Sequence, residues 1–292
     1  MSDVMQFQNG NKEKRAAVYR KILIHAGMVF VALILIFPYM YMLLRSLMTG
    51  AQVQLLPTEI IPRPISFQGW MRMFGEENYG KALLQTMKII GFNVIAVPLS
   101  GSFVAYGFAK NNFFGKKFVF ALMMATMLLP GAVLQTPLYV MFGKFGWLET
   151  PLPLTLPNLF GGGAIYIFLI RQYMIGIPNE LEEASRIDGA NAFRRYCQIT
   201  LPLCFPVLVY IVINVFNAAW SDFYGPLLYM STSGKETLAY LVFNGTTSTN
   251  ITPDKTNIRM AAGMFMSIFP AMLFVIFQKQ LIDGVSTSAL KG

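Results

Sequence analysis

Long apolar runs alternate with shorter polar segments along most of this chain. Each run is longer than the roughly 20 residues that a helix needs to cross the hydrocarbon core of a bilayer. The pattern therefore predicts an all-α polytopic membrane protein with six transmembrane helices. The predicted spans cover about residues 22–47, 82–109, 118–142, 152–173, 203–229 and 258–281.

Proline and glycine interrupt some of these runs. Pro38 lies inside the first run and predicts a kink, and Pro157 with the glycines at 161–163 is expected to loosen the fourth. The polar stretch between the first and second runs predicts a short helix at about residues 67–74. The first run has no short apolar core followed by a small-residue cleavage site, so we expect it to remain as the first span.

Basic residues indicate which side of the membrane each connecting segment faces. They are concentrated in segment 1–21, in the turn after the second run and in the polar run after the fourth. Because Lys and Arg accumulate on the cytoplasmic side, both termini are predicted to be cytoplasmic. The expected organisation is an amino-terminal tail at 1–21, a transmembrane domain at 22–281 and a carboxyl-terminal tail at 282–292.

The polar run at residues 178–202 separates the fourth and fifth spans. Asn179 and Glu182 have the spacing of a capping box, and Gly189 can end the helix that they begin. A second short helix is predicted at about residues 190–199. The apolar stripe of the first helix consists of Leu181, Ala184 and Ile187. On physical grounds alone, this segment fits either a solvated connection or a surface that is offered to a partner.

Composition supports a membrane protein and offers little for catalysis. Of the 292 residues, 55% are hydrophobic and 13% are charged, and cytoplasmic Lys and Arg explain the net charge of +9 without a nucleic-acid partner. The Gly-Lys-Glu run at 234–236 lacks the spacing and the hydroxyl residue of a P-loop. His25 is the only histidine, and Cys197 and Cys204 form no metal or disulfide pattern. We expect no enzyme activity, cofactor or metal site in this chain.

The polar run resembles the EAA loop of ABC importer membrane subunits, which reads Glu-Ala-Ala, then Asp-Gly-Ala, then Ile-x-Leu-Pro. Residues 183–185, 188–190 and 199–202 occupy these places, with Ser185 for the second Ala and Tyr196 where Phe is usual. The likeness covers nearly the whole chain after about residue 20. Motifs similar to those of carbohydrate importers, and of the maltose-type second permease subunit, lie at 105–110, 129–130, 137–139, 146–150, 168–178, 220–223, 226–227 and 277–292.

This resemblance implies a type I ABC importer permease fold in the bacterial cytoplasmic membrane. The polar run would be a cytoplasmic coupling helix that docks on an ATPase subunit, with Glu183 pairing with a basic group there. The partners implied are a second homologous permease subunit, two ATPase subunits that bind ATP and Mg, an extracytoplasmic solute-binding protein and membrane lipid. The implied ATPase contacts are Glu183, Ala184, Ser185, Asp188, Gly189 and Ala190 in the loop, and Leu290, Lys291 and Gly292 in the tail.

Polar residues inside the spans are candidates for a solute pathway. They are Asn93, Asn214, Asn217, Trp220, Ser221 and Asp222. Amides and aromatic rings suit sugars, because amides bind hydroxyl groups and rings cover C–H faces. Hydrogen bonding between helices is the alternative role for each of these side chains.

The sequence thus predicts a permease subunit of a binding-protein-dependent importer for a sugar or oligosaccharide. One alternative is an ABC permease for another polar solute, and a different class would be a membrane-embedded scaffold or a secondary transporter. A secondary transporter needs ionisable groups at mid-span, and only Lys88 and Asp222 are candidates. Arg45 and Lys88 are basic residues near membrane depth, so an acidic sugar is also compatible with the sequence as the substrate.

Overall fold

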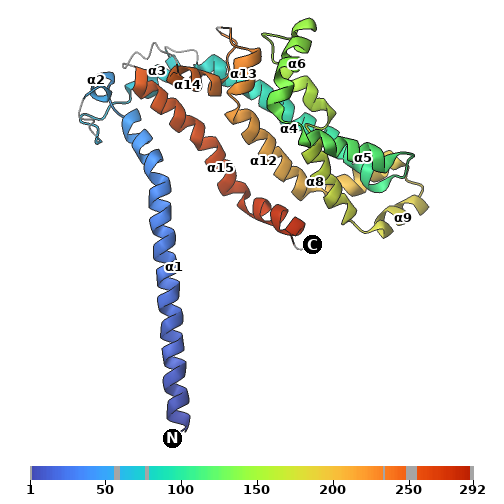
Figure 1. Cartoon of the computed structure of the whole chain (residues 1–292), viewed down its shortest axis with the longest axis horizontal. Helices are drawn as coiled ribbons and strands as arrows, with labels where there is room; N and C mark the ends of the chain where they lie inside the picture. The colour runs from blue at the N-terminus through green and yellow to red at the C-terminus, as the bar shows by residue number, and fades with distance from the viewer. Residues whose placement is uncertain (1, 56–59, 76–78, 233, 248–254, 290–292) are drawn as a thin grey trace. The chain divides into compact units, whose positions relative to one another are not determined.

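The computed structural model describes the chain except residues 1, 56–59, 76–78, 233, 248–254 and 290–292, and omits the side chains of 2–17, 245–247 and 280–289 as well. All regular structure in the described residues is helical (Figure 1). Four of these helices are long and apolar enough to cross a membrane, and two bent pairs raise the number to six if each pair is one span. This confirms the predicted all-α polytopic fold class.

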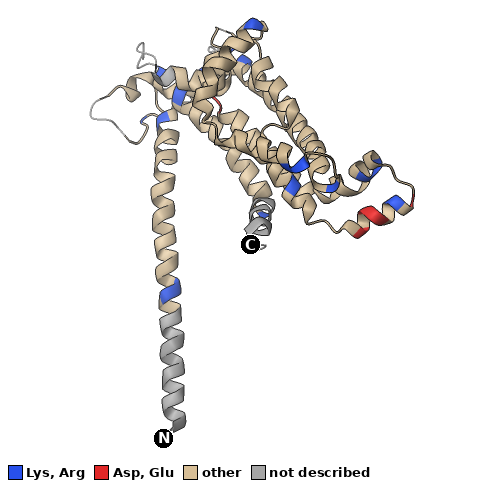
Figure 2. Ribbon diagram, turned by 45° about the vertical axis from the view of Figure 1, so that its right-hand side comes forward, with Lys and Arg blue, Asp and Glu red and all other residues tan. Residues whose placement is uncertain are grey.

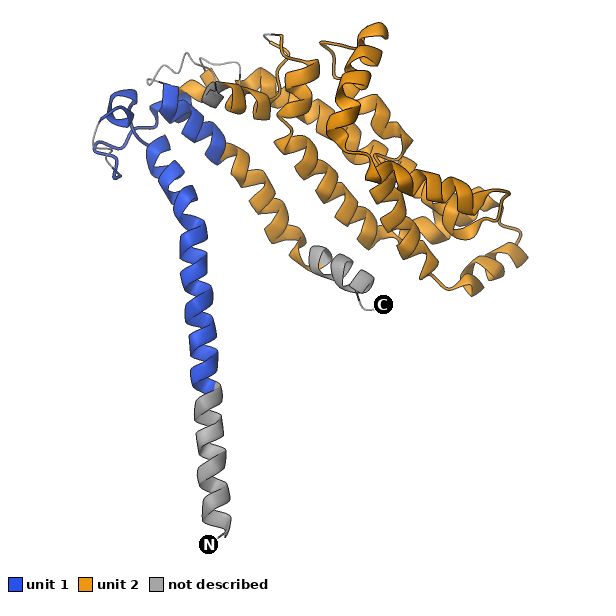
Figure 3. Cartoon of the chain, in the orientation of Figure 1, with its two compact units in different colours: residues 1–71, 252–264 blue, residues 72–251, 265–292 orange. Residues whose placement is uncertain are grey.

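The chain forms two compact units, coloured separately in Figure 3. Unit 1 comprises residues 1–71 and 252–264, and unit 2 comprises residues 72–251 and 265–292. Unit 1 contains α1 (Ser2–Ser46), α2 (Gly50–Val53), the start of α3 (Gln68–Gly75) and the start of α15 (Thr256–Ala289). The position of α3 confirms the short helix predicted at 67–74.

Helix α1 differs from expectation at its beginning. It starts at Ser2 and continues through Pro38, so the segment predicted as a tail at 1–21 is part of the same helix. The Lys, Glu, Arg and Ala residues at 12–17 explain this continuity, because they are strong helix formers. Its apolar part, Val18–Ser46, buries none of its most hydrophobic window inside the protein.

Hydrogen bonds fasten the end of α1 inside unit 1. Asn257 Nδ2 donates to the Met48 carbonyl at 3.1 Å, and Trp70 Nε1 donates to Ser46 Oγ at 3.1 Å. Asn257, Met48 and Ser46 are fully buried. These contacts therefore hold the residues that follow the first span against the start of α15.

Unit 2 is a helical bundle around one central helix. Helix α4 (Tyr79–Lys110) has 56% of its apolar window buried, whereas the windows of the fourth and sixth spans have 28% and 11%. Helix α4 packs against α8 (Ala164–Ile175) and α12 (Phe205–Ser221). The core between them includes Val97, Ala105, Ile170, Met174 and Ile211.

Two predicted spans are bent rather than continuous. The third consists of α5 (Lys116–Ala125) with η1 (Thr126–Leu128), followed by α6 (Gly131–Lys144) at an angle of 99°. Leu129 is extended there because the following Pro130 disfavours the helical conformation. In the fifth, residues 192–203 meet α12 at 76°, on either side of Cys204.

Helix α12 ends earlier than the boundary predicted at Tyr229. It stops at Ser221, Asp222 is extended, and a new helix α13 (Tyr224–Tyr229) follows. The Asp222 carboxylate accepts a hydrogen bond from the Gly225 backbone N–H at 2.9 Å, which satisfies a donor in the first turn of α13. A further short helix, α14 (Leu238–Thr247), precedes α15.

The fourth span contains the predicted irregularity. It consists of α7 (Leu152–Thr155), the 3-10 turn η2 (Leu156–Phe160), three glycines and α8. Gly161, Gly162 and Gly163 all have positive φ, at 94°, 67° and 125°, which explains why glycine is needed at each place. The last span, α15, has a non-helical residue at Phe277 and then continues as a helix to Ala289, beyond the predicted tail boundary at 282.

Candidate functional site

The polar run forms a short exposed helix at one end of unit 2, α9 (Asn179–Ile187) (Figure 1). The predicted capping box at its start is wrong. Pro178 is the extended residue before the helix, so Asn179 is already helical and makes no side-chain cap. The Asn179 amide oxygen instead accepts from Lys110 Nζ at 2.9 Å, and the same ammonium group donates to the Ile177 carbonyl at 2.8 Å. The helix start is therefore fixed to the end of α4.

The end of α9 confirms the role predicted for Gly189. Its φ of 79° lies in the left-handed region that favours glycine. The Gly189 N–H donates to the Arg186 carbonyl at 3.1 Å, and the Ala190 N–H donates to the Ser185 carbonyl at 3.0 Å. These two bonds form a Schellman motif, so the chain leaves the helix in a defined direction.

The segment after α9 is more irregular than the single helix predicted at 190–199. Helix α10 (Ala192–Arg195) is capped by the preceding Asn191, whose side chain accepts from the Arg194 N–H at 2.8 Å. A π-helical turn, η3 (Tyr196–Thr200), and the short α11 (Leu201–Leu203) follow. The widened turn accompanies burial of both Tyr196 and Thr200 against the bundle. Tyr196 Oη and Ser102 Oγ of α4 share a hydrogen bond of 2.8 Å.

The apolar stripe of α9 points outward. Leu181 is 45% exposed, Ile187 is 87% exposed, and Ala184 is exposed as well. The buried face instead contains Ser185, whose hydroxyl donates to the Glu182 carbonyl at 2.8 Å. An amphipathic helix that exposes its apolar stripe on a protein surface presents an interaction surface.

The structure places most of the residues predicted for ATPase contact on this outward surface. Ser185 is buried and Ala190 is half-buried, while the other four are exposed: Glu183, Ala184, Asp188 and Gly189. Figure 2 shows the acidic residues of α9 in red with basic residues on the neighbouring segments. The tail residues Leu290, Lys291 and Gly292 lie outside the described residues.

One residue of the loop escaped sequence reasoning. The Glu182 side chain is only 13% exposed. Its Oε1 accepts from Thr200 Oγ1 at 2.8 Å, and its Oε2 accepts from Tyr106 Oη at 3.2 Å and from Arg195 Nε at 3.4 Å. The capping-box spacing drew attention to Glu182 for a local role, and no sequence signal indicated that its partners come from three other elements.

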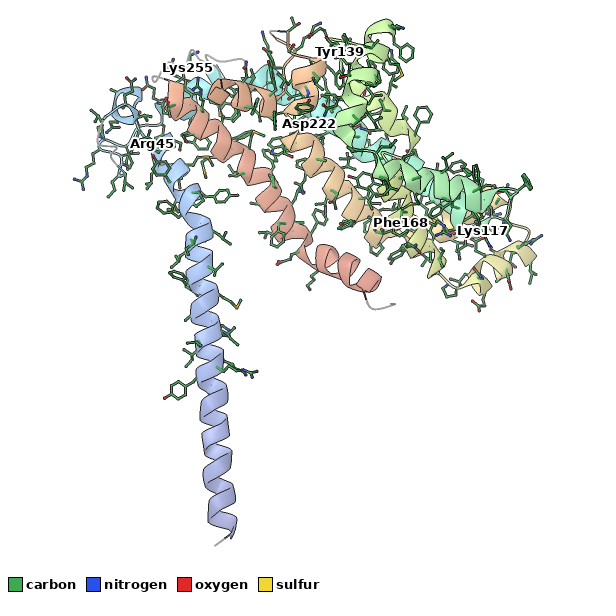
Figure 4. The ribbon with its side chains drawn as sticks, viewed as in Figure 1. Arg45, Lys117, Tyr139, Phe168, Asp222 and Lys255 are labelled. Carbon is green, nitrogen blue, oxygen red and sulfur yellow. The ribbon has the colours of Figure 1, made fainter. Side chains whose placement is uncertain are left out.

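A partly open cavity of about 440 Å³ lies in unit 2, lined by both apolar and polar residues, and is called the polar cavity below for its Asn, Asp and Thr side chains. Asn93 of α4 and Asp222 after α12, both predicted for the solute pathway, line it, and Asp222 is labelled in Figure 4. Sequence reasoning missed Asn158 and Tyr166, which also line it. Asn158 Nδ2 donates to Asn93 Oδ1 at 3.1 Å, so the two amides form one polar surface.

The other predicted pathway residues do not line this cavity. Trp220 is a core residue, 2% exposed, whose Nε1 donates to the Met266 carbonyl at 2.8 Å. Asn214 and Ser221 donate to carbonyls one turn earlier in α12, each at 2.8 Å. The amide oxygen of Asn217 is buried and has no hydrogen-bond partner among the described residues. Of the two roles weighed from the sequence, hydrogen bonding within or between helices describes the side chains of Trp220, Asn214 and Ser221.

The described fold is therefore a helical membrane bundle with a partly open cavity and an exposed amphipathic helix. Residues 98–287 match the family described as binding-protein-dependent transport system inner membrane component, and this chain belongs to that family. The match covers α9, η3 and the helices that line the cavity downstream of Pro98.

Characterised relatives span nearly the same length. The arabinooligosaccharides transport system permease protein AraQ of Halalkalibacterium halodurans is 28% identical, covering 92% of this chain and 96% of the relative. The galactooligosaccharides transport system permease protein GanQ of Bacillus subtilis is 29% identical, covering 91% and 93%. The melibiose/raffinose/stachyose import permease protein MelC of Bacillus subtilis is 30% identical, covering 80% and 84%.

Solved structures support the fold. A chain of a bacterial ABC transporter involved in the import of the acidic polysaccharide alginate superposes with a TM-score of 0.78 at 21% identity, covering 88% of this chain and 95% of the other. A second structure, of a bacterial alginate ABC transporter in complex with its alginate pentasaccharide-bound periplasmic protein, gives a TM-score of 0.62 at 14% identity, with coverage of 89% and 93%.

Proposed function

We propose that this chain is a permease subunit of an importer that moves a sugar or oligosaccharide across the bacterial cytoplasmic membrane. A solute-binding protein delivers the sugar from outside, and a second permease subunit completes the pathway. Two separate ATPase subunits bind ATP and Mg and drive the conformational change that opens the sugar pathway to one side of the membrane and then to the other. Both termini and α9 face the cytoplasm. The carbohydrate names of the relatives and the polar cavity support this proposal.

The outward apolar stripe of α9 is the observation on which the ATPase contact rests. The bundle leaves Leu181, Ala184 and Ile187 uncovered although burial would stabilise each of them. Glu183 stands on the same exposed helix and supplies a charge that can orient the partner. A small apolar surface bordered by the exposed acids Glu180, Glu183 and Asp188 fits a cleft that contains a basic group.

We expect Ile187→Glu to separate the permease from its ATPase. The new charge would be buried without a partner in the docked complex, which is strongly unfavourable. The tagged chain is purified from membranes with its co-expressed partners, and co-purified ATPase and sugar uptake are measured. Phe114→Glu is the matched control, because Phe114 is also a fully exposed apolar residue and lies in the predicted cytoplasmic turn before α5.

The wild-type chain should bring down an ATPase and support sugar uptake, and Phe114→Glu should retain both. Ile187→Glu should lose most of the ATPase while the permease still inserts in the membrane. A wild-type complex without any ATPase, or one that transports no sugar, would refute the proposed function. Equal ATPase recovery for the wild type and Ile187→Glu would show that α9 is not the surface on which the ATPase docks.

A further inference from the structure

Three elements converge on the Glu182 carboxylate. Tyr106 belongs to α4, Thr200 ends the π-helical turn η3, and Arg195 ends α10. Their donor atoms lie 3.2, 2.8 and 3.4 Å from the carboxylate oxygens. Arg195 also donates through Nη1 to the Ala190 carbonyl at 2.8 Å. Its guanidinium therefore connects the turn after α9 to the Glu182 carboxylate.

Two of these elements continue into walls of the polar cavity. Helix α4 contributes Thr86, Ile89, Asn93 and Val97 to the cavity. Thr200 leads through α11 and the bend at Cys204 into α12, which contributes Val215, Ala218 and Ala219. The Glu182 side chain of α9 therefore touches one helix that lines the cavity, α4, and the segment that leads to another, α12.

The charge of Glu182 suits this arrangement. A carboxylate has about four acceptor sites and no donor, so it satisfies a phenol, a hydroxyl and a guanidinium together. An amide of the same shape keeps one acceptor oxygen, has a donor group in place of the other and carries no charge to attract the Arg195 guanidinium. Hydrogen bonds to an ionised acceptor are also roughly twice as strong as neutral ones.

We propose that Glu182 is the positioning residue through which movement of α9 reaches α4 and α12 together. Glu183 and the apolar stripe meet the partner on the outer face of α9, and Glu182 connects the inner face to the cavity walls. This inference rests on the proposed function, and it assigns the transmitting role to the buried neighbour of the exposed acid. The parallel contact of Lys110 with Asn179 and Ile177 reaches only α4.

The test uses the complete transporter in proteoliposomes with its binding protein and with a sugar that the wild type transports. Sugar imported per ATP hydrolysed is measured for Glu182→Gln. We expect this ratio to fall by about tenfold or more, because the negative charge that strengthens the bonds to all three elements is removed at once. Glu180→Gln is the matched control, since Glu180 lies on the same helix, is exposed and undergoes the same charge change. It should stay within about twofold of wild type.

The ratio of sugar imported to ATP hydrolysed distinguishes a defect in coupling from a defect in folding. Misfolded transporter lowers import and hydrolysis together and leaves their ratio unchanged. Tyr106→Phe and Thr200→Val should each lower the ratio less than Glu182→Gln does, and neither should add to its effect, because all three act through one carboxylate. A wild-type ratio in Glu182→Gln, or full additivity with Tyr106→Phe, would overturn this inference. A wild-type complex that imports no sugar would instead overturn the proposed function.

Discussion

Adjacent glutamates in α9 have opposite surroundings. Glu183 is exposed, whereas Glu182 is mostly buried and bonded to Tyr106, Thr200 and Arg195. Successive helical residues are rotated by about 100°, so neighbours in sequence face different environments. The resemblance to a known loop directs attention to Glu183, and only the packing of α9 on the bundle distinguishes its neighbour.

Gly189 provides a test at the same scale. We expect Gly189→Val to reduce sugar uptake strongly, because a β-branched residue is strained at a φ of 79° by roughly 1–2 kcal/mol or more. No atom lies within 4 Å of the position that a Cβ would occupy, so the strain comes from the backbone within this chain. Uptake by the reconstituted transporter and recovery of the ATPase are the measurements.

Gly189→Asn is the companion variant. Asparagine tolerates the left-handed conformation better than other non-glycine residues, so we expect it to keep most of the activity. If Asn and Val are equally harmful, contact with the partner rather than φ decides the requirement for glycine at this position.

At the scale of elements, the bent spans show why helix boundaries were harder to predict than helix existence. The six apolar runs of the sequence coincide with the four long apolar helices and the two bent pairs, although the fifth run was extended past the end of α12 at Ser221. The 99° bend at Leu129 and the 76° bend at Cys204 were missed, because an apolar run has the same hydropathy whether it is straight or broken. Proline at 130 was visible, but its effect depends on the packing that follows.

The glycine turn between η2 and α8 gives a prediction about packing. A Cβ on Gly162 would lie 2.5 Å from a methyl group of Val97 on α4. We expect Gly162→Ala to destabilise the protein by about 2–4 kcal/mol, from overpacking together with the positive φ. Thermal unfolding of the purified transporter in detergent measures this change.

Gly91→Ala is the control on α4, because no atom lies within 4 Å of its added Cβ and alanine favours a helix. It should be neutral or slightly stabilising. Equal melting temperatures for Gly162→Ala and the wild type would show that the turn and α4 are not closely packed.

At the scale of the whole molecule, the charge of the cavity gives a prediction about the substrate of the proposed importer. Asp222 is the only charged residue among those that line it in the described part of the chain. Arg45 and Lys88 were the reason for considering an acidic sugar, but neither lines the cavity. Arg45 is a buried residue of unit 1 whose Nη2 donates to the Val53 carbonyl at 3.1 Å, and Lys88 is exposed. A carboxylate without a lining cation repels anionic sugars and accepts hydrogen bonds from neutral ones.

We therefore expect uptake of neutral oligosaccharides to exceed uptake of uronate oligosaccharides of equal length. Asp222→Asn should narrow that preference several-fold while the subunit still folds, because an Asn side chain can still accept from the Gly225 N–H. Competition assays with both sugar types on the reconstituted transporter measure the preference. An unchanged preference in Asp222→Asn would exclude this carboxylate as a determinant of charge selection.

The sequence by itself determined that this is an all-α membrane protein with six apolar runs. It also determined that the polar run at 178–202 contains a helix that ends at Gly189. These features follow from local composition and from the conformational limits of single residues. The tertiary structure alone decided which acid of α9 is buried, that its apolar stripe faces outward, and which polar side chains meet in one cavity. Those outcomes depend on contacts between segments far apart in sequence, such as Tyr106 with Glu182 and Asn93 with Asn158, and no local pattern encodes them.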